Sequence, residues 1–418
     1  MTETRLLKPP APARRLRTMT ALGPAFVAAI AYLDPGNFAT NFTAGASTGY
    51  QLVWVILLAN LTAMPVQYLA AKLGIVTGRS LPQHCRDRMP RPGAWLMWGQ
   101  AELVAMATDL AEFVGAAIGL HLLFGMSLPV AALVTAVVAY GVLAFQRRGH
   151  RPFELAIGAM LAFICIGFGY LVMRIPPSPG NALAGLTPDL SGPETILLAT
   201  GLIGATIMPH AVYLHSGLTS QRGARPAPTQ IRQLLRFTRI DIGIAMGIAG
   251  LVNLSMLGIA AELFAPHGST GSLDLGMVHG RLAEAIGGGA ALAFAAALLA
   301  SGISSSSVGT AAGQIIMDGL LGRRIPIWLR RTITMAPAVI LLTSGVDPTR
   351  ALLLSQVVLS FGIPFALGAL LWLTSRRGVL GDHVNGRAMT YGMALVAAVI
   401  VSLNLLLLVQ QVRAWLPF

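Results

Sequence analysis

Two short stretches of the 418-residue chain decide its fold, AYLDPGN at Ala31–Asn37 and ATIMPH at Ala205–His210. Each places a proline in the middle of a long apolar segment. Because proline removes a backbone donor and clashes with the preceding helical turn, each stretch is expected to break a helix. Irregular backbone inside a membrane is tolerated only where it lines a cavity, so two broken helices predict a binding site. The alternative is that both prolines merely kink ordinary helices.

The composition excludes a water-soluble globular protein. Hydrophobic residues make up 55% of the chain, charged residues only 11%, and the mean hydropathy is +0.70. Such a chain lacks the polar surface to cover itself in water. A membrane-crossing helix needs roughly 20 apolar residues, whereas barrel strands are shorter and alternate. The sequence therefore predicts an all-α integral membrane protein with helical spans at residues 20–45, 51–75, 94–121, 129–146, 153–173, 194–219, 238–263, 283–310, 327–345, 350–374 and 388–411.

The formal net charge of +13 comes from basic residues that alternate by loop. They cluster before the first span and after the second, fourth, sixth, eighth and tenth, while the opposite loops carry few, mainly Arg174 and Arg350. This positive-inside bias predicts a cytoplasmic N-terminus and, with an odd number of spans, an external C-terminus in a cell inner (plasma) membrane. It explains the charge without a nucleic-acid partner. The two cysteines, Cys85 and Cys165, lie far apart in this topology, so we expect no disulfide and no thiolate metal site.

The two broken spans each open a group of five, residues 19–180 and 181–375. Because five is odd, the second group enters the membrane from the opposite side, which makes an inverted repeat of the LeuT type. Residues 1–18 are basic and proline-rich and are expected to form a disordered cytoplasmic tail. Residues 376–418 add a loop and an eleventh helix that stands outside the repeat.

The two breaks carry residue types that suit a transition-metal ion. A carboxylate such as that of Asp34 costs roughly 2.5 to 3.5 kcal/mol at the centre of a membrane helix, so it needs a cation or a proton. Asn37 offers an oxygen close to Asp34, and the carbonyls of Ala31 and Ala205 lie where the half-helices end. Met208 adds a polarizable sulfur, which favours manganese, iron, cadmium or cobalt over calcium.

A stripe of acids follows in the third span, where Glu102, Asp109 and Glu112 fall on one face of the helix. Such a stripe could relay protons across the membrane. It could equally be neutralised as static ion pairs by Arg330 and Arg331 at the start of the ninth span. The two interpretations are compatible if a paired acid exchanges its proton during transport.

Further polar residues lie in or beside the apolar spans. His210 and His215 could each be a metal ligand, a proton carrier or an ordinary packing residue, and a role in protonation or gating is open for both. They point about 140° apart on a regular helix and are not expected to share one ion. Gln356 in the tenth span could join the site or bond across helices. Asp347 lies just before that span on the outer side, and Thr108 belongs to the acidic third span; both are accessory candidates.

Four stretches together resemble the Nramp family of proton-coupled divalent transition-metal transporters, and in particular its bacterial manganese importers. They are DPGN at Asp34–Asn37, DLAE at Asp109–Glu112, MPH at Met208–His210 and GQIIMDG at Gly313–Gly319. The first and third are specific as a pair, because related members that take magnesium or aluminium are expected to lack this methionine. Asp318 and Leu320 depart from the family pattern in the loop motif, and the twelfth span of many members is absent.

The resemblance implies roles for individual residues. It implies a metal site made of Asp34, Asn37 and Met208 with the carbonyls of Ala31 and Ala205, joined by Gln356 in the occluded state. It also implies that His210 is linked to proton coupling, that Asp347 lies near the outer mouth, and that a proton route contains Asp34, Asp109, Glu112, Arg331, Glu102 and Arg330. His215 and Thr108 are gating or accessory candidates that the resemblance does not assign.

We therefore expect a proton-coupled importer of Mn²⁺ that also takes Fe²⁺, Cd²⁺ and Co²⁺ and works by alternating access. The metal is cargo and the proton a coupling ion, so no resident cofactor and no obligate protein partner are expected besides the lipid bilayer. One alternative is a sodium- or proton-coupled amino acid transporter of the same fold, which the carboxylate beside a thioether disfavours. Another is an intramembrane enzyme, but the sequence has no His-Glu-x-x-His, Gly-x-Gly-Asp or Gly-x-Ser-x-Gly motif.

Overall fold

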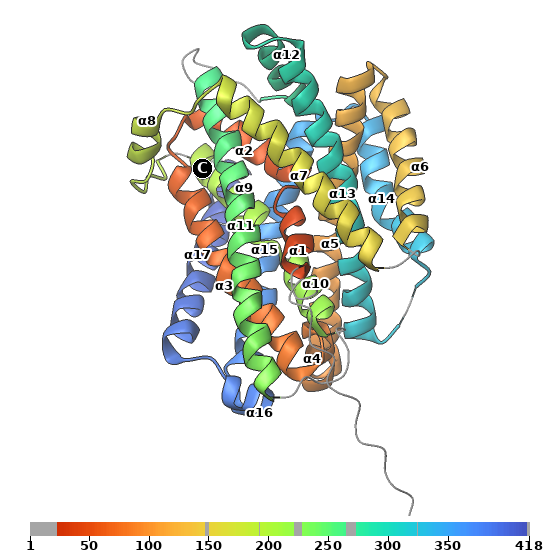
Figure 1. Ribbon diagram of the computed structural model, residues 1–418, viewed down its shortest axis with the longest axis vertical. Coiled ribbons are helices and arrows are strands. Elements are labelled where there is room, and N and C mark those ends of the chain that lie inside the picture. Colours follow the sequence, from red (N-terminus) through yellow and green to blue (C-terminus); the bar gives the residue numbers. More distant parts are fainter. Residues whose placement is uncertain are drawn as a thin grey trace, which may run out of the picture.

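Helices form the described part of the chain in the computed structural model, which covers residues 23–146, 150–191, 193–220, 228–264, 273–323 and 325–415; no strand occurs in these ranges. The tail predicted at residues 1–18 lies outside them. The helices, shown in Figure 1, are α1 (Pro24–Ala31), α2 (Pro35–Thr48), α3 (Val53–Thr77), α4 (Leu81–Arg88), α5 (Arg91–Phe124), α6 (Leu128–Gln146), α7 (His150–Arg174), α8 (Pro179–Ala184), α9 (Pro193–Thr206), α10 (Pro209–Ser220), α11 (Pro228–Phe264), α12 (Leu275–Ala285), α13 (Gly288–Leu321), α14 (Ile327–Thr343), α15 (Pro348–Thr374), α16 (Arg377–Leu380), the 3₁₀ turn η3 (Gly381–His383) and α17 (Arg387–Trp415).

Both proline stretches interrupt a helix, as the sequence predicts. Residues 32–34 separate α1 from α2, and residues 207–208 separate α9 from α10. Proline alone does not have this effect, since α3, α14 and α15 each continue through an internal proline. At the first break the Asp34 side chain caps α2 by accepting a hydrogen bond from the backbone N–H of Asn37, which gives the chain a new helix start. The structure therefore favours breaks over kinks.

The helices account for all the predicted spans. Each span falls mainly on one helix, or on a pair of helices for the first and the sixth. The bounds differ most at α11, which begins ten residues before its span, and at the span 283–310, which starts within α12 and ends well before the end of α13. Eight described segments are long and apolar enough to cross a membrane, with α9 and α10 counted as one. Three predicted spans are not among these eight. They correspond to the broken pair of α1 and α2, to α6, and to α14, which has only 17 residues. The prediction of a multi-pass helical membrane protein is confirmed.

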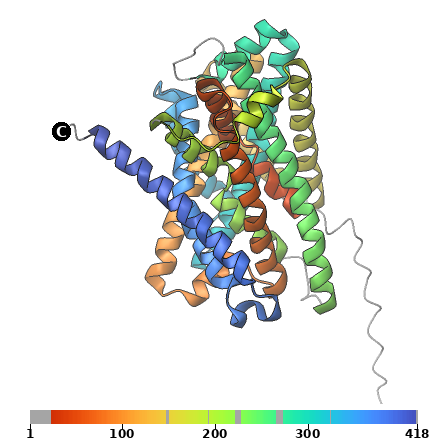
Figure 2. The ribbon, with the colours of Figure 1, turned by 90° about the vertical axis from the view of Figure 1, so that its left-hand side faces the viewer.

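The short connecting helices lie at opposite ends of the bundle (Figure 1). At one end lie α4 and α16, which belong to the arginine-rich loops; at the other lie α8 and α12, which belong to the loops predicted to be external. Figure 2 shows α17 leaving the bundle as it runs toward the end that carries α8. The alternation of basic loops thus corresponds to two ends of the molecule. That the arginine-rich end faces the cytoplasm stays a prediction.

The broken helices occupy the middle of the bundle. All residues of α2 from Pro35 to Ala46 are buried, and the apolar window of α9 and α10 is 94% buried. The corresponding windows of α7 and α17 are only 28% and 22% buried, so these helices form the outer surface. Phe42 of α2 packs edge-on against Phe294 of α13 with ring centroids 5.3 Å apart, which helps to hold α2 in place.

Candidate metal centre

The two breaks meet around Asp34. One carboxylate oxygen, Oδ1, accepts hydrogen bonds from the backbone N–H of Asn37 at 2.8 Å and from its side-chain Nδ2 at 2.7 Å. The same Nδ2 donates to the carbonyl oxygen of Ala205 at 3.0 Å, so Asn37 connects the first break to the end of α9. The Nε2 atom of Gln356 donates to Asp34 Oδ2 at 3.4 Å. Asp34, Asn37, Gln356 and Met208 are all 0% exposed.

The remaining predicted ligands lie in the same breaks. Ala31 is the last residue of α1, and its carbonyl oxygen accepts from the backbone N–H of Asp34 at 3.3 Å. Met208 is one of the two residues between α9 and α10, and its carbonyl accepts from Val212 in the first turn of α10 at 3.4 Å. The hydrogen bond between Asn37 and Ala205 brings together residues that are 168 positions apart in the chain.

The donor set fits a cation that accepts mixed ligands. Asn37 Oδ1 and Gln356 Oε1 are buried and have no hydrogen-bond partner among the described residues. An amide that rotates by half a turn presents its oxygen where its nitrogen was, so both side chains can offer oxygen beside the Asp34 carboxylate. No group of three His, Cys, Asp or Glu residues that could hold a metal occurs in the described part of the chain. A metal centre here has to use amide, carbonyl and thioether ligands with the one carboxylate.

Two glycines allow α15 to approach the breaks. A Cβ atom on Gly36 would lie 1.7 Å from Nε2 of Gln356, and one on Gly204 would lie 1.9 Å from the Gln356 backbone oxygen. No real side chain tolerates such distances. The close packing positions Gln356 over Asp34, which favours a role in the site over a simple bond across helices.

The acidic stripe on α5 lies beside the two arginines of α14. Arg331 Nη1 donates to Asp109 Oδ1 at 3.2 Å, and Arg330 Nη2 donates to Glu102 Oε1 at 3.0 Å. Both pairs are mostly buried; the side chains of Arg331 and Asp109 are only 3% and 4% exposed. The predicted ion pairing is therefore present, and the proton relay stays a hypothesis.

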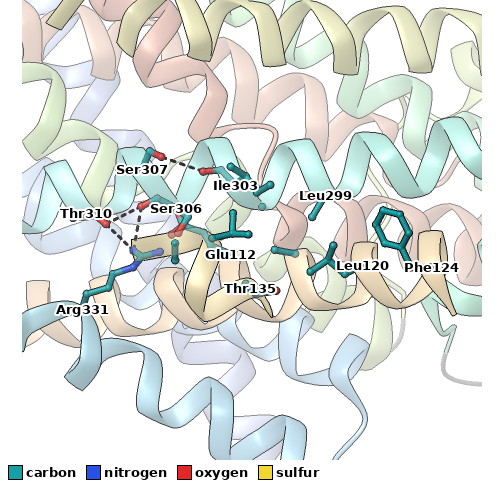
Figure 3. Close-up of a pocket in the computed structure, with 14 residues that line it drawn as sticks. Glu112, Leu120, Phe124, Thr135, Leu299, Ile303, Ser306, Ser307, Thr310 and Arg331 are labelled. Atoms are coloured by element: carbon teal, nitrogen blue, oxygen red, sulfur yellow. Dashed lines mark hydrogen bonds between the residues drawn. The ribbon is translucent and has the colours of Figure 1, made fainter. Parts of the chain in front are cut away.

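Glu112, the third acid, has no such partner. It is 1% exposed, and neither of its carboxylate oxygens has a hydrogen-bond partner within the described residues. It lines a cavity of about 240 Å³ between α5, α6 and α13, together with Arg331. Figure 3 shows the cavity running from Arg331 past Glu112 toward Leu120 and Phe124. A buried carboxyl group beside a cavity is free to change its protonation state without breaking an ion pair.

The two histidines have different partners. The Thr108 hydroxyl donates to the Val104 carbonyl at 3.0 Å, so the His210 Nδ1 that lies 3.2 Å from it acts as the donor and Nε2 carries the lone pair. His215 Nδ1 lies 2.8 Å from Gln67 Oε1, and Gln67 Nε2 donates to the Tyr32 hydroxyl at 2.6 Å. His210 thus connects α10 to the acidic helix α5, while His215 connects it to the first break.

Comparison with known proteins identifies the chain. Residues 25–410 match the Nramp family, described as natural resistance-associated macrophage protein-like. The chain belongs to the Nramp family. It is similar to proteins named divalent metal cation transporter MntH, with 51% identity over 390 residues to that of Deinococcus radiodurans (93% of this chain, 89% of the relative). It is also 48% identical over 402 residues to that of Aeromonas hydrophila (96% and 98%).

Solved structures agree with this assignment. Crystal structures of variants of the Eremococcus coleocola manganese transporter are 31% identical and superpose with a TM-score of 0.85 over 97% of this chain and 90% of theirs. Mhp1, a nucleobase-cation-symport-1 family transporter, is 16% identical with a TM-score of 0.61, over 95% of this chain and 94% of its own. These likenesses confirm the fold, an inverted repeat of five plus five helices of the LeuT type with an eleventh helix.

Some residues that support the Nramp site were missed in the sequence. Asn253 of α11 donates to the Tyr32 carbonyl at 3.1 Å, and the Ser301 hydroxyl of α13 donates to the Leu33 carbonyl. Both satisfy backbone groups that the first break exposes. The available signal was polar side chains inside apolar spans, Asn253 in one and the serine-rich stretch that begins at Ser301 in the other. Asp347, predicted near the outer mouth, caps α15 by accepting from the Thr349 N–H at 2.9 Å, about 13 Å along the helix from Gln356.

Proposed function

We propose that this Nramp protein imports Mn²⁺ together with protons by alternating access, and that Fe²⁺, Cd²⁺ and Co²⁺ are further cargo. The relatives named divalent metal cation transporters support divalent metal transport and disfavour the intramembrane enzyme. The observation that carries the proposal is the fully buried Asp34, linked to Gln356 and, through Asn37, to Ala205 across both breaks. The metal is cargo, with no resident cofactor.

The metal would bind to the ionised Asp34 carboxylate, because a ligand must be deprotonated to coordinate. Asn37 and Gln356 would add amide oxygens, and the carbonyls of Ala31 and Ala205 would lie at the ends of α1 and α9. The Met208 thioether would contribute more to Mn²⁺ than to Ca²⁺, since sulfur is a soft ligand. The donor set therefore supports selection of transition metals.

The burial of the site and the two breaks support alternating access. A site whose side chains are 0% exposed can exchange its ion only if helices move. The residues between α1 and α2, and between α9 and α10, are non-helical and can absorb changes in backbone angles. We propose that the half-helices move at these points to open the site to one side at a time, with the arginine-rich end in the cytoplasm and the C-terminus outside.

The proton would move from Asp34 toward the acids of α5. Glu112 lies beside a cavity, its oxygens make no hydrogen bond to a described residue, and Asp109 on the same helix is held by Arg331. His210, bonded to Thr108, lies between the second break and α5 and offers a lone pair on Nε2. A potential of 100 mV, negative inside, adds roughly 4.6 kcal/mol for a dication, so uptake is favoured.

An amino acid as cargo is disfavoured by the cap of α2. Transporters of this fold that take carboxylates use the positive N-terminus of a half-helix to bind them. Here the Asp34 carboxylate accepts the hydrogen bond from the backbone N–H of Asn37 and occupies that position. A second carboxylate would meet like charge at the same place.

Uptake of Mn²⁺ into proteoliposomes with an inward proton gradient tests the proposal. Asp34→Asn keeps a side chain suited to capping α2 but removes the charge, so uptake is expected to fall to the level of empty liposomes. Glu284→Gln, which removes an exposed acid in α12, is the matched control and should leave uptake unchanged. Full uptake by Asp34→Asn, or competition by amino acids, would contradict the proposal.

A further inference from the structure

A second cavity, of about 270 Å³, lies at the arginine-rich end of the bundle between α3, the first turns of α11 and η3. No acidic residue of the described part of the chain lines it. The side chains that matter here are Tyr68 and Lys72 of α3, Arg232, Arg236 and Arg239 of α11, and His383 of η3. Four cationic side chains thus face one small volume that no part of the transport mechanism uses.

Lys72 supplies the buried part of this cavity. It is 6% exposed, and its Nζ donates to the neutral side-chain oxygen of Asn385 at 2.7 Å. An ammonium group has three donors, and a buried cation is costly unless it is paired. None of the ion pairs among the described residues involves Lys72. Its surroundings therefore suit an anionic ligand.

The three arginines lie on one face of α11, because they are spaced by four and three residues. Arg239 is held against α3, with its guanidinium carbon 4.7 Å from the centre of the Tyr68 ring and its Nη2 donating to the Tyr68 hydroxyl at 2.9 Å. Arg232 and Arg236 are exposed at the rim, and the ion pairs in the described ranges do not include them. Like charges gathered in this way are stabilised when an anion binds between them.

The surface beside the cavity indicates which anion. Ile240, Ile244 and Leu251 follow Arg236 on the same face of α11, and their side chains are 48%, 49% and 69% exposed. Leu61 and Leu58 lie on the same face of α3 as Lys72, and their side chains are 62% and 48% exposed. The two helices run side by side (Figures 1 and 2). A cationic cavity continuous with an exposed apolar surface matches an amphiphile better than a soluble phosphate.

We propose that this cavity binds the phosphate of an anionic phospholipid headgroup, and that the acyl chains lie along the surface formed by α3 and α11. The ligand connects three elements, since Lys72 belongs to α3, the arginines to α11 and His383 to η3. The inference is independent of which metal the protein carries. It identifies one place on the protein where a lipid of the membrane binds.

Native mass spectrometry of the detergent-purified full chain, titrated with phosphatidylglycerol or phosphatidylcholine, tests the proposal. Phosphatidylglycerol is expected to bind more tightly. Arg232→Gln with Arg236→Gln removes two charges and is expected to weaken its binding roughly 30-fold. Arg91→Gln with Arg323→Gln removes two exposed arginines at the same end but outside the cavity, and should leave binding unchanged.

Three outcomes would overturn the lipid assignment. The first is equal affinity for the two lipids, and the second is an equal loss of phosphatidylglycerol binding in both double variants. The third is loss of the phosphatidylglycerol complex when inorganic phosphate is added at millimolar concentration. The last would assign the cavity to a soluble phosphate. Persistence of the complex in phosphate supports the lipid. If the double variant does not fold, Arg236→Gln alone is expected to weaken binding roughly 5-fold.

Discussion

The ion pair between Arg331 and Asp109 makes a quantitative prediction. Arg331 Nη1 contacts Asp109 Oδ1, the Ser306 carbonyl at 3.1 Å and the Thr310 hydroxyl at 2.6 Å, and the pair is almost fully buried. Replacing Arg331 by Met leaves the Asp109 charge buried without a partner. Breaking a buried pair in this way is expected to reduce the free energy of unfolding by about 3–5 kcal/mol.

The neighbouring pair provides the control. Among the described residues the Arg330 side chain donates only to Glu102, and the two side chains are 7% and 16% exposed, so this pair has fewer hydrogen bonds and is less buried than the first. Arg330→Met is expected to cost about 1.5–3 kcal/mol, the usual contribution of a hydrogen bond to a charged group. Both values can be measured as apparent free energies of unfolding in mixed micelles with sodium dodecyl sulfate.

A double variant separates the stability of this pair from its role in transport. Replacing Arg331 by Met and Asp109 by Leu removes both charges, so most of the lost stability should return. Proton-driven Mn²⁺ uptake should stay lost if Asp109 belongs to the proton route. Equal destabilisation by the two single arginine variants, or a double variant less stable than Arg331→Met, would refute the reasoning.

Three more predictions concern other parts of the chain. Met208→Ala should narrow the preference for Mn²⁺ over Ca²⁺ in competition uptake, and unchanged selectivity would contradict the thioether argument. Gly204→Ala should abolish uptake, because its Cβ would lie 1.9 Å from the Gln356 oxygen, whereas Gly201→Ala has 3.4 Å to its nearest neighbour and should be tolerated. In α4, burial first and then neighbouring arginines lower the pKa of His84 from 6.5 to about 4. The unfolded chain therefore takes up this proton first, and stability is lost as pH falls from about 6.5 to 4. His84→Gln should reduce that loss in thermal unfolding measured across this range; an unaltered pH profile would argue against it.

The sequence was sufficient to predict the breaks and the spans, because proline and apolar length act locally. It also indicated that the acids of α5 and the arginines of α14 belong together, since charges in a membrane need partners. It could not predict which acid pairs with which arginine. Asp109 is held by Arg331, whereas the Glu112 oxygens have no hydrogen-bond partner among the described residues, and this depends on how α13 and α14 pack on α5.

The supporting hydrogen bonds were beyond prediction for the same reason. His215 reaches Gln67 at a separation of 148 residues, and Gln67 in turn reaches Tyr32. Each of these residues alone reads as an ordinary polar side chain in an apolar helix. Their shared role becomes visible only when α3 and α10 pack around the first break. Together these hydrogen bonds then fix the position of the residues between α1 and α2.

The backbone carbonyls at the two breaks accept hydrogen bonds from different parts of the protein. This difference suggests how ion binding would be coupled to movement of the helices. The first is held by surrounding helices, since Asn253 and Ser301 donate to the carbonyls of Tyr32 and Leu33. At the second break, the Ala205 carbonyl accepts instead from Asn37, which belongs to the first. In the proposed site a cation on Asp34 would take the oxygen of that amide, and turning the amide would withdraw its nitrogen from the Ala205 carbonyl. Under that proposal, ion binding and the hydrogen bond between the broken helices would compete for Asn37, so the arriving cargo would loosen a contact that has to change for the site to open.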